Sequence, residues 1–269
     1  MERGNSNVTD SLTETSVGKQ KNRGFAFAHW AFMAALMTPI FLLTLMMASH
    51  LGYVSFDLGF KFLTLQIGPA MAKVALAISC LSLLISLFMA PGRCGPWAFA
   101  AVLISGMTLG GFAAYHTALK RFPPIADVAT NWERPLTFSD KLVADRGADA
   151  IAIEDLPRVP HNESLDWGGK TIPDINEATC PGARTIKGHA VTEDQVVAML
   201  RANKYVVFGS APWRVEATYQ DNFYGFKTDI VIRLDPNGTD VRSVSRYNMP
   251  DMGSNCRRVT DIVNKIRAL

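Results

Sequence analysis

The chain has 269 residues, is 48% hydrophobic and carries a net charge of +3. The positive surplus lies entirely in residues 1–117, which hold 7 Lys and Arg against 4 Asp and Glu, whereas residues 118–269 hold 20 of each. A neutral C-terminal part lacks the basic stripe with which nucleic-acid-binding domains replace counterions on phosphate, so nucleic acid is not an expected partner. Its roughly 150 residues are enough for one domain with its own core.

Three apolar stretches, over 25–49, 67–90 and 97–117, are long enough to cross a bilayer, whose core takes about 20 helical residues. The first is too long for a signal peptide, and no clear cleavage site follows it. The sequence therefore predicts an N-terminal tail over 1–24, a region of three transmembrane helices over 25–117 and an outer domain over 118–269.

The positive residues beside the predicted spans indicate their orientation, because lysine and arginine accumulate on the inner side. The inner set is Arg3, Lys19, Lys21, Arg23 and Arg93, against Lys61, Lys120 and Arg121 on the other side. We expect a multi-pass protein of a bacterial inner membrane, with its C-terminal domain in the periplasm.

Gly106 and Gly110 form a GxxxG pattern, which lets helices approach closely. It indicates either packing inside the three-helix bundle or a homodimer through these glycines. The lipid bilayer is the expected partner of the spans, together with a possible protein partner. His50 and His116 end spans and are interpreted as interfacial residues, so no cofactor is expected.

The outer domain shows a clear pattern from residue 191 onward. A capping box at Thr192 and Gln195 predicts a helix over 193–203. Alternating apolar residues predict strands over 205–210, 213–220, 226–234 and 240–247, with a hairpin at Asn237–Gly238, and a last helix covers 254–268. We expect an α+β domain whose antiparallel sheet is covered by helices on one face. Residues 139–190 are rich in loops, which indicates a surface-wrapping or binding segment.

Two cysteines lie in the outer domain. Cys180 and Cys256 would form a disulfide in an oxidising compartment, but Cys256 also falls on the apolar stripe of a helix, where a free buried thiol is equally natural. Both alternatives stand. No metal-ligand spacing appears, since His161 and His189 lack neighbours of ligand type.

The segment RSVSRYNMPDMGSNCRR, residues 242–258, resembles the closing motif of the domain of unknown function 1499 family. That motif is approximately Arg-Ser-x-Ser-Arg-x-Gly-x-x-Asp-x-Gly-x-Asn-x-x-Arg, and Asn248 stands at its usual first glycine. PPIADVAT resembles the opening of the family, with Ala126 at its usual histidine. The resemblance covers residues 122–269 and implies a membrane-anchored member with three N-terminal spans. It implies no activity.

The arginines of this motif gather around one turn, and three interpretations stay open. They are a structural network with the carboxylates of Asp251, Asp261, Asp229 and Glu216, an anion or partner site, and catalysis. Arginine is a poor general acid or base near neutral pH, which disfavours catalysis, and no catalytic residue is assigned. The candidate ligand-binding residues are Arg242, Ser243, Ser245, Arg246, Asp251, Asn255, Arg258 and Asp229. We expect an outer domain that binds a partner protein or an anionic small molecule or lipid. The alternative is a hydrolase or transferase that holds an anionic substrate at the arginine turn.

Overall fold

The computed structural model describes residues 6–89, 91–160 and 166–269, with side chains from residue 25 onward. His161 lies outside these residues. The chain divides into two compact units, Met1–Tyr115 and His116–Leu269.

The first unit contains the apolar helices. They are α1 (Ser6–His50), the π-helical segment η1 (Asp57–Ile67), α2 (Gly68–Met89) and α3 (Pro91–Arg121), whose last residues extend into the second unit. Three stretches are long and apolar enough to cross a membrane, namely Phe25–His50, Asp57–Met89 and Pro91–Arg121. The three predicted spans are therefore confirmed by length and composition.

Small side chains fill the contacts between these helices. Buried positions recur at intervals of three and four residues along each of them: Ala28, Ala31, Ala35 and Thr38 on α1, Ala72, Ala75, Ser79, Ser82 and Ser86 on α2, and Cys94, Ala98, Ala101 and Ser105 on α3. The Ser79 and Ser105 hydroxyls lie 3.4 Å apart. Without a hydrophobic driving force between helices in lipid, such short side chains gain packing contacts by letting backbones approach.

The predicted packing of the GxxxG glycines inside this bundle is wrong. A Cβ added at Gly106 or Gly110 would meet no heavy atom within 4 Å. The physical reason is helix geometry, because Gly106 follows the inward-facing Ser105 and is rotated from it by about 100°. The homodimer through these glycines stays a prediction.

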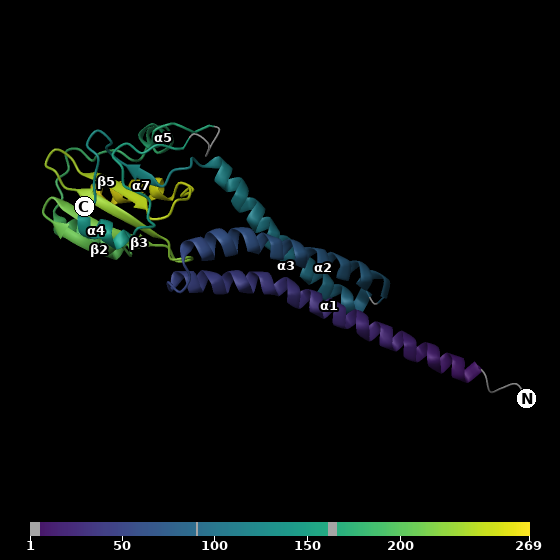
Figure 1. Ribbon diagram of the computed structural model, residues 1–269. Coiled ribbons are helices and arrows are strands. Elements are labelled where there is room, and N and C mark those ends of the chain that lie inside the picture. Colours follow the sequence, from purple (N-terminus) through teal and green to yellow (C-terminus); the bar gives the residue numbers. More distant parts are fainter. Residues whose placement is uncertain (1–5, 90, 161–165) are drawn as a thin grey trace, which may run out of the picture. The chain divides into compact units, whose positions relative to one another are not determined.

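The second unit is built on one antiparallel sheet with the order β1-β5-β4-β3-β2 (Figure 1). Its strands are β1 (Asp127–Ala129), β2 (Val206–Ala211), β3 (Arg214–Gln220), β4 (Lys227–Arg233) and β5 (Asp240–Ser245). Its helices are α4 (Asp140–Arg146), α5 (Ile172–Thr179), α6 (Glu193–Ala202) and α7 (Ser254–Arg267). The α+β prediction is confirmed, as is the capping box of Thr192 and Gln195.

The two faces of the sheet differ in chemistry. On the apolar face, Val215, Ile230 and Val241 pack with α6 and α7 in the main core. The opposite face carries Val231 and Val244 among charged side chains, and we call it the charged face. Residues 136–154 cover it, and Leu136, Phe138 and Leu142, the last in α4, form a second, smaller core with these valines. The later part of the loop-rich segment, including Val159, Ile172 and Ile186, packs in the main core instead.

Strand register defines two ends of the sheet. At one end Asp127 pairs with Val244, Thr228 with Ser245, and Lys227 with Gln220. The chain enters the sheet there after α3, so we call it the tether end. At the far end Asp240 pairs with Arg233 and Arg233 with Arg214.

A disulfide joins Cys180, at the end of α5, to Cys256 in the first turn of α7, with the two Cα atoms 5.6 Å apart. Of the two alternatives left open by the sequence, the disulfide is therefore the one found. The bridge holds the loop-rich segment against the core helix and closes a loop with a sequence separation of 76 residues.

Reducing this bridge will destabilise the outer domain. Because the closed loop is long, the chain-entropy model gives a loss of about 4 kcal/mol. The unfolding free energy of the solubilised full-length Cys180→Ser/Cys256→Ser variant measures the loss, with Cys80→Ser/Cys94→Ser as the matched control. A loss below about 1 kcal/mol would show that the bridge does not constrain the fold.

Candidate functional site

The residues of the arginine turn do not form one cluster. Arg242 and Val244 of β5, and Arg246 directly after it, lie on the charged face, whereas Ser243 and Ser245 alternate with them and contact α7 on the apolar face. The predicted ligand-binding set is thus divided by the sheet itself.

Arg242 is fully buried and paired with Asp127 of β1. Its Nε and Nη2 donate to the two carboxylate oxygens at 3.0 and 2.6 Å. Two further N–H groups donate to the carbonyls of Leu136 and Glu154, each at 2.7 Å, and the guanidinium lies 5.0 Å from the Trp132 ring. Burial raises the pKa of Asp127, and the Arg242 guanidinium opposes this by favouring the ionised form.

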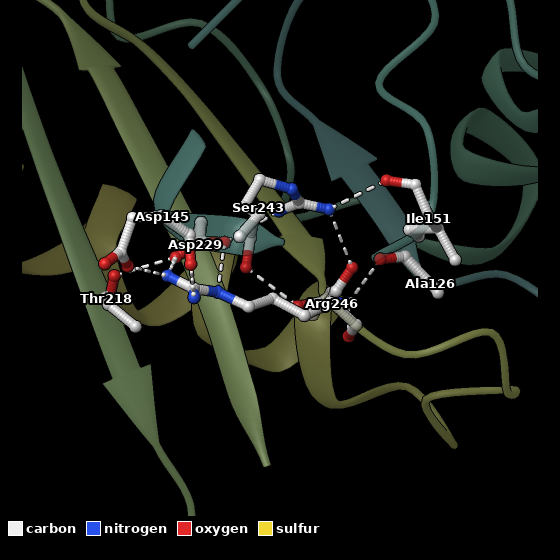
Figure 2. A network of polar contacts seen from close by, with 10 residues as sticks. Ala126, Asp145, Ile151, Thr218, Asp229, Ser243 and Arg246 are labelled. Atoms are coloured by element: carbon white, nitrogen blue, oxygen red, sulfur yellow. Dashed lines mark hydrogen bonds and ion pairs between the residues drawn. The ribbon is translucent and has the colours of Figure 1, made fainter. Parts of the chain in front are cut away.

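Asp229 of β4 anchors the second pair on this face (Figure 2). Arg246 donates to both of its oxygens, at 2.9 and 2.8 Å, and Arg146 of α4 donates to one at 2.7 Å. The Thr218 hydroxyl adds a bond at 2.7 Å, and Asp145 supplies a second carboxylate to Arg246 at 2.9 Å. Two arginines therefore meet two carboxylates, and the group is electrically balanced.

Asn255 of α7 organises the polar contacts on the apolar face. It is fully buried, accepts from the Ser243 hydroxyl at 2.8 Å and donates to Ser245 Oγ at 3.0 Å and to the Ala126 carbonyl at 2.9 Å. One amide side chain thus ties α7 to β5 and to the residue before β1. Such a buried polar group is stable only because its hydrogen bonds are made.

Asp251 stabilises the start of α7. Its carboxylate accepts from the N–H groups of Gly253 at 2.8 Å and Asn255 at 2.7 Å, which places a negative charge at the helix N-terminus. Burial raises its pKa against these two donors. The residues of the turn with a left-handed backbone are Met252 and Gly253, whereas Asn248, at the family's usual glycine, has a negative φ.

Arg258 is enclosed by α7 and β3. It donates to Asn255 Oδ1 at 2.9 Å, and its guanidinium lies 4.5 Å from the Tyr219 ring. Burial lowers its pKa, and its interactions with Tyr205 and Tyr219 oppose that effect. Arg257 instead donates to the Met252 carbonyl at the surface.

The contacts of Arg242 and Arg246 with carboxylates are those expected of a structural network. Arg257 and Arg258 bond to uncharged groups instead, and Arg257 is exposed. The sequence indicated Asp229 as a partner of the arginines, and the structure confirms it. Glu216 pairs with Arg214 and Asp261 with Lys265 instead, whereas Asp127, Asp145 and Arg146 are partners that sequence reasoning missed. Whether any of the eight residues binds a ligand stays a prediction.

A polar pocket lies at the far end of the sheet, away from the motif. It has a volume of about 430 Å³ and lies between β1, α5 and the β4–β5 hairpin. Three cations contribute to its wall: Arg134, Arg184 and Lys187. Among the described residues, no three His, Cys, Asp or Glu side chains lie close enough to hold a metal ion. The Cys180 sulfur is bonded to Cys256 and is not a free nucleophile.

The Arg242–Asp127 pair should be essential to stability. Arg242→Met leaves a buried carboxylate without its cation, which typically costs about 3–5 kcal/mol, and Asp127→Leu should cost as much. The double variant should be less destabilised than the sum of the two, by about 2 kcal/mol or more, in denaturant unfolding of the solubilised protein. Additive effects would contradict direct pairing.

The comparisons with known proteins agree with the motif. A family model described as Protein of unknown function (DUF1499) matches residues 127–266, from the carboxylate of the first buried pair to the last turn of α7. No curated protein and no solved structure matches the chain. The matched region contains the sheet, the buried arginine pairs and the disulfide, and the chain therefore belongs to the DUF1499 family, as a member with three N-terminal apolar helices.

Proposed function

We propose that the protein is a membrane-tethered binding protein whose outer domain holds a small polar molecule with a carboxylate or phosphate group in the far-end pocket. The observation that supports this most is the distribution of cations. The arginines on the charged face are buried and bonded to carboxylates, whereas the pocket gathers cations that remain exposed.

Among the pocket cations, Arg134 is exposed and donates to Asp235 at 3.2 Å, and the other two are held only weakly by the protein. Arg184 lies 4.0 Å from Glu177, with both side chains more than half exposed, and Lys187 is exposed. Surface pairs of this kind contribute little to stability, so the side chains are available to a ligand. An anionic group entering between them would gain charge-assisted hydrogen bonds.

Carboxylates also line the pocket, and two of them are already bonded within the protein. Asp240 accepts from Arg233, Thr130 and Thr185, and Asp174 accepts from the Thr171 hydroxyl. Glu133 and Glu177 remain exposed at the wall. This mixture favours a ligand that has hydrogen-bond donors beside its anionic group over a bare anion.

The state of the cysteines supports a proposal for the compartment of the outer domain. We propose that the domain faces the periplasm of a bacterial inner membrane. Its two cysteines form a disulfide, whereas Cys80 and Cys94 of the helical unit are free. Disulfides persist in oxidising compartments and are rare in the cytosol. The same side is favoured by the positive residues beside the spans.

Ligand binding can be tested by thermal unfolding of the full-length protein with citrate and with inorganic phosphate. A ligand that binds the folded state raises the unfolding temperature in a saturable way. Arg184→Ala/Lys187→Ala should weaken the apparent affinity at least tenfold, while Arg201→Ala/Arg267→Ala, an exposed pair outside the pocket, should not. An equal response of both variants, or no saturable response to either probe, would count against the pocket.

Orientation can be tested with reporters fused after Leu269. A phosphatase that folds only under oxidising conditions should be active, and a fluorescent protein that matures only in the cytoplasm should be dark. The reverse pattern would overturn the periplasmic assignment without affecting the pocket proposal.

A further inference from the structure

We propose that the tether end of the outer domain docks on the surface of an anionic bilayer, with the β3–β4 hairpin as an aromatic anchor at the lipid interface. The proposal does not depend on a ligand in the far-end pocket. It rests on chain connectivity, on one exposed phenylalanine held by a rigid loop, and on the charges around it.

Connectivity keeps the tether end near the membrane. The apolar helix α3 ends at Arg121, and β1 begins at Asp127. The residues between them, even fully extended, span only about 20 Å. In register, the β3–β4 hairpin lies at the same end of the sheet as the start of β1, because Lys227 pairs with Gln220 and Asp127 with Val244.

The hairpin has a rigid frame that presents one side chain outward. The Asp221 carboxylate accepts from the N–H groups of Phe223 at 2.7 Å and Tyr224 at 3.1 Å, and also from that of Phe226. The rings of Tyr224 and Phe226 stack, and Phe226 contacts Tyr247. Phe223 takes no part in this packing and is 68% exposed.

An exposed phenylalanine forgoes the free energy that burial of its ring would give, because its apolar surface stays in contact with water. Val206, which begins β2 at the same end, is likewise 69% exposed. Aromatic and aliphatic groups recover this free energy at a membrane interface, where the polar backbone of the loop stays hydrated.

The charges at the tether end favour an anionic surface. Lys120, Arg121, Lys204 and Lys227 are all exposed. Three carboxylates at this end bond within the protein, since Asp221 binds the hairpin amides, Asp145 binds Arg246 and Asp251 binds the start of α7. Asp149, close in sequence to Ile151, whose N–H donates to the Arg246 carbonyl, is exposed, so cations outnumber exposed carboxylates here without being alone. Each lysine or arginine near an anionic leaflet adds electrostatic attraction to it.

The test uses the full-length protein, one copy per nanodisc, in a Cys80→Ala/Cys94→Ala background that keeps the disulfide. An environment-sensitive fluorophore is attached at Asn222→Cys, beside Phe223, or at Asn237→Cys, in the exposed tip of the β4–β5 hairpin at the far end. Phosphatidylcholine nanodiscs with and without phosphatidylglycerol contain a spin-labelled lipid as quencher. We expect at least twofold stronger quenching at 222 than at 237, and a further increase with phosphatidylglycerol.

Two variants separate docking from mere proximity. Phe223→Ser should lower quenching at 222 in both lipids, whereas Lys204→Glu/Lys227→Glu should lower it only with phosphatidylglycerol. Equal quenching at 222 and 237, or quenching that Phe223→Ser leaves unchanged, would overturn the anchor. If the 222 probe is shielded only when two copies share a disc, the hairpin contacts a second copy and the lipid proposal is wrong.

Discussion

The outer domain depends on two carboxylates buried on the charged face of its sheet, those of Asp127 in β1 and Asp229 in β4. Asp127 holds Arg242 of β5, and Asp229 holds Arg246, the residue after β5, each by two hydrogen bonds. Arg242 then donates to the carbonyls of Leu136 and Glu154, and Arg246 donates to Asp145. Residues 136–154 are thereby fixed against the charged face of the sheet. Because a buried charge is costly without its partner, strands and covering loop must form together. The arginines of the family motif therefore stabilise the attachment of the covering residues to the sheet.

Much of this fold can be predicted from local pattern. The strands and helices after residue 191 lie within one or two residues of expectation, since alternation and capping are local signals. The partners of the arginines are not local: Asp127 lies 115 residues before Arg242. The only sequence signal for it was its place in the opening motif of the family. Similarly, the GxxxG pattern in α3 predicted that glycines pack inside the bundle. The residues that do so are instead alanines and serines spaced three and four apart.

The separation of the motif from the pocket changes where function should be sought. Arg258, one of the candidate ligand-binding residues, contacts the Tyr219 ring and donates to Asn255, so its cation serves the contact between α7 and β3. Arg134, Arg184 and Lys187 are exposed around the far-end pocket. Phe223 is exposed at the tether end, where four further cations are exposed, and Trp213 is exposed at the far end. In the two proposals made above, the far end of the domain binds small polar solutes and the tether end contacts lipid, with the sheet between them.

The most direct test of the central role of these arginines is hydrogen exchange at the guanidinium Nε–H groups, observed by NMR in the full-length protein with labelled arginine. If Arg242 and Arg246 are buried in ion pairs with carboxylates, their Nε–H groups should exchange far more slowly than that of exposed Arg184. Exchange as fast as that of Arg184 would mean that solvent, and hence an anionic ligand, reaches the motif, and would contradict its structural role.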